Sequence, residues 1–186
     1  MKILGISGSP VKNGNNEKAI DYVLQKAKGF DIEKITLAKQ DIKGCIACNT
    51  CKEEKGKCSI KDVMEDIRPK LIEADAIIIS SPVYFGSVSS QIKALFDRTL
   101  PLRRDGFKLK NKIGGAIAIG RSRNGGQEFT IQAIHNWMHI HGMIVVGDNN
   151  HFGGIIVAPF EDDELGKKTV DDMVEKVCGL LGKIKK

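Results

Sequence analysis

Short apolar segments alternate with amphipathic segments along almost the whole of this 186-residue chain. The run Ala76-Ile77-Ile78-Ile79 is typical of a strand that is buried on both faces of a sheet. Residues 17–28 and 62–73 instead place their apolar side chains at helical spacing. Because parallel strands must be joined by crossover connections, this alternation predicts an α/β fold around a parallel sheet.

The expected elements suffice for a flavodoxin-like, doubly wound sheet of five parallel strands. We expect strands at residues 2–7, 32–37, 74–80, 112–119 and 143–146. We expect helices at residues 17–28, 62–73, 89–100, 127–141 and 162–181. Ligands of such sheets bind beyond the carboxyl ends of the strands, so functional residues should follow the first, third and fourth strands. The expectation is one domain, residues 1–186, with a cysteine-rich loop inserted at about residues 43–60.

Composition excludes several classes of function. Hydrophobic residues make up 41% and charged residues 28%, which is ordinary for a soluble globular protein. The formal charge of +6 suits an acidic partner or a phosphate, but aromatics are only 5% and no helix-turn-helix or finger pattern indicates nucleic-acid binding. No apolar run approaches the roughly 20 residues that span a membrane, and no signal peptide is evident, so we expect a cytoplasmic protein without a membrane partner.

A polar, glycine-rich loop follows the first expected strand and leads into a helix. Its sequence is Ser7-Gly8-Ser9-Pro10-Val11-Lys12-Asn13-Gly14-Asn15-Asn16. Free N–H groups at a helix N-terminus favour a phosphate, and glycine allows close approach of the backbone. Because the loop matches neither the nucleotide triphosphatase pattern nor the dinucleotide pattern, we expect it to bind a terminal monophosphate. The alternative is an ordinary strand-to-helix turn with Asn16 as the N-cap.

A second unusual loop follows the third expected strand. Its sequence, Ser80-Ser81-Pro82-Val83-Tyr84-Phe85-Gly86-Ser87-Val88-Ser89, combines proline, aromatic residues and serines. Such a loop would present main-chain groups and an aromatic side chain to a planar heterocycle. The alternative is that Tyr84 and Phe85 cap the hydrophobic core.

Four of the five cysteines lie within fourteen residues, at Cys45, Cys48, Cys51 and Cys58. Thiolates are soft ligands for zinc or iron–sulfur clusters. Structural zinc sites generally use two cysteine pairs that are far apart in sequence, whereas three closely spaced cysteines are typical of a [4Fe–4S] site. We therefore expect these four residues to ligate a [4Fe–4S] cluster, with zinc or free thiols as alternatives. Cys178 belongs to the last expected helix and is predicted to be a core thiol.

These motifs, together with Lys93-Ala94-Leu95-Phe96-Asp97-Arg98, resemble the NADPH-dependent FMN reductase branch of the flavodoxin superfamily. The resemblance implies that the first loop holds the FMN phosphate, that the second loop contacts the isoalloxazine, and that residues 120–126 close over the ring. The cofactor-binding residues that it implies are Ser7, Ser9, Pro10, Asn13, Gly14, Asn15, Asn16, Pro82, Val83, Tyr84, Phe85, Gly86, Ser122, Asn124 and Gly125.

With the cysteine motif, the chain is similar to the iron–sulfur flavoproteins of anaerobic prokaryotes, which carry one FMN and one [4Fe–4S] cluster per subunit. The resemblance implies a flavin-dependent oxidoreductase that takes electrons from ferredoxin and passes them to oxygen, peroxide or a quinone. It also implies a homodimer or homotetramer. No catalytic acid or base is expected. The alternatives are an NAD(P)H-dependent FMN or quinone reductase without a cluster, and a non-catalytic flavodoxin-like electron carrier.

Four further groups of residues have less specific interpretations. His135 and His139 are helical neighbours that could bind a metal, but a polar helix face and a packed Trp137 are the favoured interpretation. Asp97 and Arg98 could form a buried pair or a subunit contact. The lysines around the cysteines could be a solvated surface or a docking surface for an acidic electron carrier; they are Lys43, Lys52, Lys55, Lys57 and Lys61. The more distal basic residues Arg103, Arg104, Lys108, Lys110 and Lys112 could equally be solvated.

Overall fold

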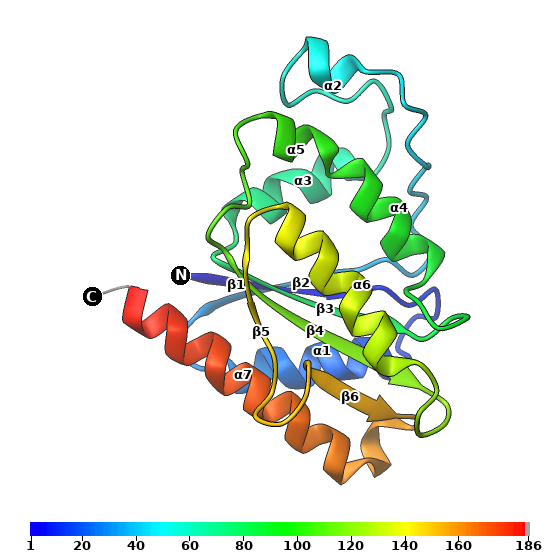
Figure 1. Cartoon of the computed structure of the whole chain (residues 1–186), viewed down its shortest axis with the longest axis vertical. Coiled ribbons are helices and arrows are strands. Elements are labelled where there is room, and N and C mark those ends of the chain that lie inside the picture. Colours follow the sequence, from blue (N-terminus) through cyan, green and yellow to red (C-terminus); the bar gives the residue numbers. More distant parts are fainter. Residues whose placement is uncertain (185–186) are drawn as a thin grey trace.

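The computed structural model describes residues 1–184 and has a central parallel sheet with helices on both faces (Figure 1). The strands are β1 (Lys2–Ser7), β2 (Asp31–Thr36), β3 (Ala76–Pro82), β4 (Ile113–Gly120), β5 (Ile144–Val146) and β6 (Gly154–Val157). The helices are α1 (Asn15–Lys26), α2 (Thr50–Glu53), α3 (Met64–Glu73), α4 (Ser90–Arg98), α5 (Leu100–Arg104), α6 (Gln127–Ile140), η1 (Phe160–Asp162) and α7 (Glu164–Ile184). The order β2-β1-β3-β4-β5 confirms the predicted flavodoxin-like sheet.

The fifth position of the sheet is shared by two short strands. β5 pairs with residues 113–115 of β4, and β6 pairs with residues 117–120 of the same strand. The sequence predicted β5 but not β6, because a polar turn interrupts the apolar pattern between them. The end of this turn packs tightly against β4: a Cβ on Gly153 would lie 2.5 Å from the Ala116 carbonyl oxygen, so only glycine allows this close approach.

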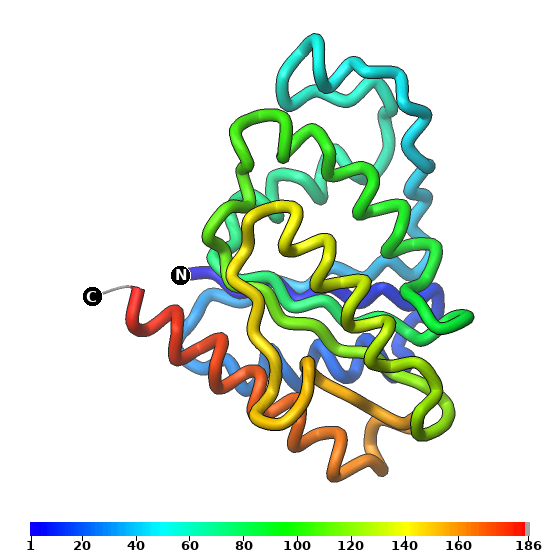
Figure 2. The backbone as a smooth tube through the Cα atoms, in the orientation of Figure 1, coloured from blue at the N-terminus to red at the C-terminus, as the bar shows by residue number. Residues whose placement is uncertain are grey.

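The isoleucine run in β3 divides its side chains between two separate cores. Ile77 and Ile79 pack with α3, α4 and α6, whereas Ile78 packs with α1 and α7 on the opposite face. All seven residues of β3 are buried, as predicted for a central strand covered on both sides. In Figure 2 the chain leaves the sheet after β2, passes beyond α4 and α5 as the cysteine segment, and returns through α3.

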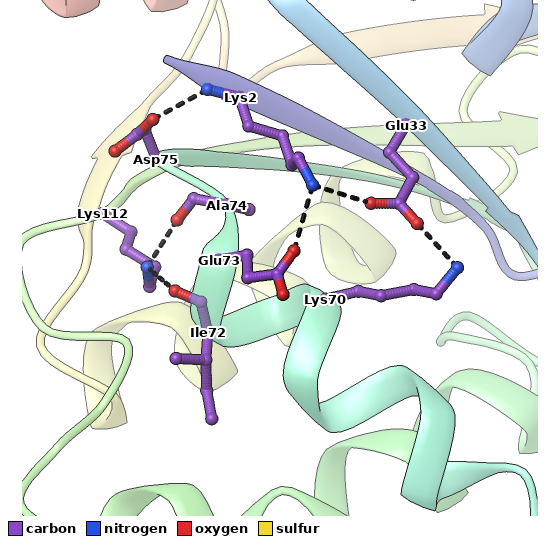
Figure 3. Close-up of polar contacts among 8 residues, drawn as sticks. All are labelled: Lys2, Glu33, Lys70, Ile72, Glu73, Ala74, Asp75 and Lys112. Atoms are coloured by element: carbon purple, nitrogen blue, oxygen red, sulfur yellow. Dashed lines mark hydrogen bonds and ion pairs between the residues drawn. The ribbon is translucent and has the colours of Figure 1, made fainter.

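Charged side chains secure the amino end of the sheet (Figure 3). The network comprises Lys2, Glu33, Lys70, Ile72, Glu73, Ala74, Asp75 and Lys112. Lys112 Nζ donates to the carbonyls of Ile72, at 2.7 Å, and of Ala74 at the end of α3. A cation at this position satisfies terminal carbonyls and opposes the negative end of the helix dipole. Lys112 is therefore structural, not part of a solvated basic surface.

A buried hydrogen-bond network joins the end of α4 to α6. Thr99 Oγ1 donates to the Phe96 carbonyl at 2.6 Å, so it accepts from Trp137 Nε1 and His141 Nε2, each at 2.9 Å. This assigns the His141 proton to Nε2, and the buried Nδ1 has no partner within residues 1–184. Burial, helped by the charge of Arg103, lowers the pKa of His141 to about 4.

We predict that acid destabilises the fold between about pH 6.5 and pH 4. The pKa of His141 is about 4 in the folded protein and 6.5 ordinarily, so in this window the unfolded chain binds a proton that the folded chain does not. The largest loss of unfolding free energy that His141 alone can cause is about 3 kcal/mol, at roughly 1.36 kcal/mol per pKa unit. Burial lowers the pKa of His135 to about 4 as well, so it adds to the effect.

Urea unfolding monitored by Trp137 fluorescence at several pH values measures this loss. His141→Gln keeps an N–H donor for Thr99 and removes the titration, so its profile should be flatter than that of the wild type. His139 is exposed on the same helix, so His139→Gln serves as the control and should follow the wild type. A His141→Gln profile as steep as the wild-type profile would contradict the assignment.

Candidate functional site

The first two predicted loops meet because β1 and β3 are neighbours, with Ser7 paired to Ser80 at their carboxyl ends. Gly8 N donates to the Ser80 carbonyl at 2.8 Å, and Ser89 Oγ donates to the Gly8 carbonyl at 2.6 Å. Ser80 Oγ donates to Asn16 Oδ1 at 2.7 Å. The loop after β1 is thus held against both the end of β3 and the start of α4.

Hydroxyl groups in the first loop are available as donors. Ser7 is fully buried, and its Oγ has no hydrogen-bond partner in the described part of the chain. Ser9 Oγ accepts from Val11 N at 3.1 Å, which leaves its own O–H free to donate. A Cβ on Gly8 would lie 2.1 Å from Ile92 Cγ1, so this position requires glycine. An unsatisfied buried hydroxyl beside a helix N-terminus fits a bound phosphate oxygen.

The N-cap of α1 is Gly14. The alternative interpretation of this loop assumed Asn16 as the N-cap and is wrong on this point. The Gly14 carbonyl accepts from the N–H groups of Glu17 and Lys18, each at 3.0 Å, and the Glu17 carboxylate accepts from Asn13 N at 2.8 Å. Asn16 lies one residue into the helix and is buried. Because its oxygen accepts from a serine, its NH2 group is the donor that remains for a ligand.

Other polar residues of this loop have structural partners. Asn15 Oδ1 accepts from Phe160 N at 2.9 Å, so this side chain is directed to η1. Glu17 is buried beside the loop; burial raises its pKa, but the Asn13 N–H and the Lys34 ammonium outweigh this and lower it. Lys34 Nζ lies 3.2 Å from the carboxylate and balances the negative charge. Pro10 is half-buried in the same loop.

The second loop forms a tight turn at the edge of the sheet. Tyr84 N donates to the Ser87 carbonyl at 2.9 Å, and Ser87 N donates to the Tyr84 carbonyl at 3.0 Å. Phe85 and Gly86 between them have φ values of 49° and 71°, which both primed turn positions require. The Phe85 side chain is fully exposed and Tyr84 is also exposed, so the alternative that these aromatics cap the core is wrong.

The third loop, which follows β4, reaches the second. A Cβ on Gly126 would lie 3.0 Å from Gly86 Cα. Gln127 Oε1 accepts from Gly125 N, and Gln127 Nε2 donates to the Ser122 carbonyl, each at 2.8 Å. The buried Gln127 therefore holds the third loop in shape, while Gly126 packs against the turn at Gly86.

The predicted cofactor-binding residues of the second and third loops differ in burial and position. Pro82 is buried as the last residue of β3, and Val83 is half-buried. Ser122, Asn124 and Gly125 are exposed, and Asn124 also lines a cavity of about 250 Å³ that faces β6 and α7. The sequence did not predict that Ser80, Ser89 and Gln127 belong to the site. For Ser80 a signal was available, because serines end an otherwise apolar strand.

The cysteine segment contains the short helix α2 and packs against α5. Cys45, Cys48, Cys51 and Cys58 all line one cavity of about 130 Å³. Its other walls include apolar residues and two arginines; they are formed by Ile46, Ala47, Asn49, Ile60, Asp97, Arg98, Leu100, Pro101 and Arg104. Within residues 1–184, no three acidic, histidine or cysteine side chains form a group that could hold a single metal ion. The all-sulfur donor set of this cavity fits the soft-metal chemistry predicted from the spacing.

The two ends of the cysteine segment are held together by a buried ion pair. Arg98 donates to both carboxylate oxygens of Asp62, at 2.6 and 3.1 Å, and to the carbonyls of Lys43 and Ile60, at 2.7 and 3.2 Å. Burial lowers the pKa of Arg98, but Asp62 and the Cys58 thiol outweigh it and raise the pKa. Burial raises the pKa of Asp62, yet Arg98 and two backbone N–H groups lower it below its usual range.

Hydrogen bonds also act on two of the thiols. Cys48 Sγ lies 3.0 Å from Ser59 Oγ and 3.3 Å from Thr50 Oγ1, and these contacts lower the pKa of Cys48 to about 7. Arg104 Nη1 donates to Cys51 Sγ at 3.2 Å. The lowered pKa of Cys48 favours its thiolate, which is the form that binds metals.

Two sequence expectations for this region are wrong. Asp97 pairs with Lys93 at 2.7 Å on the surface, whereas the partner of Arg98 is Asp62, 36 residues away. His135 is buried and does not share a polar helix face with His139. Trp137 is packed as expected and stacks on Phe96 with ring centroids 4.7 Å apart. Cys178 is half-buried at the edge of the α1 and α7 core.

A parallel sheet in this order, with three polar loops meeting at its carboxyl edge, defines a flavodoxin-like α/β protein. Two solved structures support this fold at low sequence identity. A WrbA-like flavodoxin from Agrobacterium tumefaciens has a TM-score of 0.73 at 19% identity and covers 98% of each chain. The NAD(P)H:(acceptor) oxidoreductase FerB from Paracoccus denitrificans has a TM-score of 0.71 at 16% identity, covering 98% of this chain and 97% of that one.

The model of the NADPH-dependent FMN reductase family matches residues 1–154. An iron–sulfur flavoprotein from Methanosarcina thermophila is 51% identical and covers all of this chain and 98% of its own length. Another from Methanocaldococcus jannaschii is 50% identical over the whole of both chains. The chain belongs to the NADPH-dependent FMN reductase family, in its iron–sulfur flavoprotein group, and is a flavin-dependent oxidoreductase. No helix in residues 1–184 is long and apolar enough to cross a membrane.

Proposed function

We propose that this protein is an electron-transfer oxidoreductase containing FMN and a [4Fe–4S] cluster, which passes electrons from a ferredoxin-type donor to oxygen, peroxide or a quinone. The observation that carries the proposal is the meeting of all four closely spaced cysteines in one cavity of a flavodoxin-like chain. The names of the relatives from Methanosarcina and Methanocaldococcus support the iron–sulfur part. The choice of a four-iron cluster rests on the spacing of the cysteines.

The three loops at the carboxyl edge supply the proposed FMN site. Ser7, Ser9 and Asn16 offer side-chain donors to the phosphate, and Gly8 keeps the backbone close to it. In this proposal, the turn at residues 83–87 and the facing loop at residues 121–126 contact the ring. The full set assigned to FMN is Ser7, Ser9, Pro10, Asn13, Gly14, Asn15, Asn16, Pro82, Val83, Tyr84, Phe85, Gly86, Ser122, Asn124 and Gly125.

When bound, a cluster transfers single electrons and a flavin takes up one or two, which couples a one-electron donor to a two-electron acceptor. The protein's own residues bind, orient and shield these groups. Cys45, Cys48, Cys51 and Cys58 hold the cluster, and the Arg98–Asp62 pair keeps the two ends of their loop together. We assign no catalytic acid or base.

A basic surface surrounds the cysteine loop and is the proposed docking site for the acidic donor. Lys43, Lys52 and Lys55 are exposed on the loop. Because α2 packs against α5, the loop lies beside Arg104. Complementary charge accelerates the encounter of such partners. Lys52 and Lys55 take part in none of the ion pairs found in residues 1–184, so their charges remain available.

We further propose one domain, residues 1–186, assembled as a homodimer or homotetramer in the cytoplasm, without a nucleic-acid or membrane partner. The fully exposed Phe85 and the exposed Phe129 and Ile140 on α6 are the apolar side chains available for contact between subunits. A loop of closely spaced thiols also suits a reducing compartment.

The cluster predicts about four irons and four acid-labile sulfides per chain after anaerobic purification. Cys48→Ser should lose the iron and the sulfide while keeping FMN, because the flavin loops come from other parts of the chain. Cys178→Ser, on α7, is the matched control and should keep both. A yellow wild-type protein without iron would disprove the cluster, and loss of FMN from Cys48→Ser would show that the two sites depend on each other.

Removing the unpartnered hydroxyl of Ser7 should have opposite effects on binding and stability. Ser7→Ala removes a donor to the phosphate, and hydrogen bonds to charged groups contribute about 1.5–3 kcal/mol, so the FMN dissociation constant should rise at least tenfold. The FMN-free protein should be as stable as the wild type or more stable, because the buried hydroxyl has no partner there.

FMN fluorescence titration and urea unfolding measure the two quantities. Ser81→Ala is the control, since Ser81 Oγ accepts from Ser89 N and donates to the Pro82 carbonyl. That variant should lose stability in the absence of FMN. Unchanged FMN affinity in Ser7→Ala would exclude this hydroxyl from the phosphate site.

Charge reversal tests the docking surface. Lys52→Glu/Lys55→Glu should slow reduction by a reduced ferredoxin at least tenfold at low ionic strength, and the difference should shrink as salt is added. Lys28→Glu/Lys183→Glu makes the same change in net charge beside α1 and α7 and should react like the wild type. Stopped-flow absorbance measures both. Turnover with NADPH but not with reduced ferredoxin would instead support the reductase alternative.

A further inference from the structure

Two arginine side chains face the four-cysteine cavity from different helices. Arg98 is the last residue of α4 and is 1% exposed; Arg104 is the last residue of α5 and is half-buried. Both line the cavity together with the cysteines. The sequence alone indicates a solvated surface for Arg104, and a pair with Asp97 or a subunit contact for Arg98, so it indicates no role at the thiols for either residue.

One of these arginines donates to a cysteine sulfur, and the other has an unpartnered buried N–H group. Arg104 Nη1 donates to Cys51 Sγ at 3.2 Å. The Nη groups of Arg98 are occupied by Asp62 and by two carbonyls, but its buried Nε has no partner in the part of the chain that the structure describes. An unsatisfied guanidinium N–H beside thiols requires an explanation in a buried site.

The charge at the cavity wall is positive on balance. Arg98 is partly compensated by Asp62, which is itself shared with two backbone N–H groups. Asp97 also lines the cavity, but its carboxylate is paired with Lys93. Arg104 forms none of the ion pairs within residues 1–184, so its charge acts on the thiols without a carboxylate partner.

We propose that Arg98 and Arg104 raise the reduction potential of the iron–sulfur cluster, a proposal that rests on the function proposed above. Reduction adds negative charge to a group that is already held by thiolates. A nearby fixed cation and N–H groups donated to sulfur favour the more negative state. The arginines thereby make the cluster a better acceptor for electrons from the donor, in addition to the structural role of Arg98.

Redox titration of Arg104 variants tests the proposal without disturbing the buried pair. Arg104→Gln should keep its iron and sulfide but shift the cluster's one-electron equilibrium toward the oxidised form by about tenfold, which corresponds to about 59 mV. Arg104→Lys keeps the charge and should remain close to the wild type. The FMN potential, measured in the same titration, should stay unchanged in both.

Arg103→Gln is the matched control because it makes the same charge change on the same helix. Arg103 Nε donates to the Ile140 carbonyl at 3.0 Å, and its guanidinium lies over the Phe107 ring. Arg103 does not line the four-cysteine cavity, although it lines a neighbouring cavity with Cys45. Its cluster potential should therefore shift much less than that of Arg104→Gln.

Arg98 is tested together with its partner, because Arg98→Gln alone would leave Asp62 buried and unpaired. Arg98→Gln/Asp62→Asn should also shift the potential downward.

An unchanged potential in Arg104→Gln with full iron would overturn this proposal and leave the proposed function standing. Loss of iron from that variant would overturn the proposal in favour of a structural role for Arg104. A wild-type protein without iron would overturn both. The Arg104 series decides the proposal even if the double variant does not retain its cluster.

Discussion

The buried ion pair between Arg98 and Asp62 determines where the cysteine loop lies. Burying two charges is costly, and here the cost is offset by a bidentate contact and by hydrogen bonds to Lys43, Ile60 and Met64 on both sides of the loop. Removing one partner of such a pair costs about 3–5 kcal/mol. The pair therefore closes a segment that has little regular structure of its own.

Helix α4 links this ion pair to the flavin edge. Its N-cap, Ser89, donates to the Gly8 carbonyl in the first loop, and its last residue is Arg98. Nine helical residues span about 13 Å at 1.5 Å per residue, so one short rigid element fixes both the loop after β1 and the base of the cysteine loop. The cysteine cavity and the sheet edge are thus separate in sequence but connected through packing.

The two ends of the sheet use their polar groups differently. At the amino end, Lys2 and Lys112 are committed to carboxylates and helix carbonyls. At the carboxyl end, Ser7 has an unpartnered hydroxyl within residues 1–184 and Asn16 retains its NH2 group. The parallel direction of every strand explains this division, because all the loops that can share a ligand emerge at one edge.

The sequence by itself determined the flavodoxin-like class of sheet, the positions of β1–β5 and of the long helices α1, α3, α4, α6 and α7, and the cysteine motif, because hydrophobic periodicity and ligand spacing are local properties. The short elements α2, α5 and η1 were not predicted. It did not determine that Arg98 pairs with Asp62, that His135 is buried, that Phe85 is exposed, or that β6 completes the fifth position. Only the tertiary structure decided these, since each depends on which distant segments pack together. The same applies to Arg104, whose contact with Cys51 arises from the packing of α2 on α5.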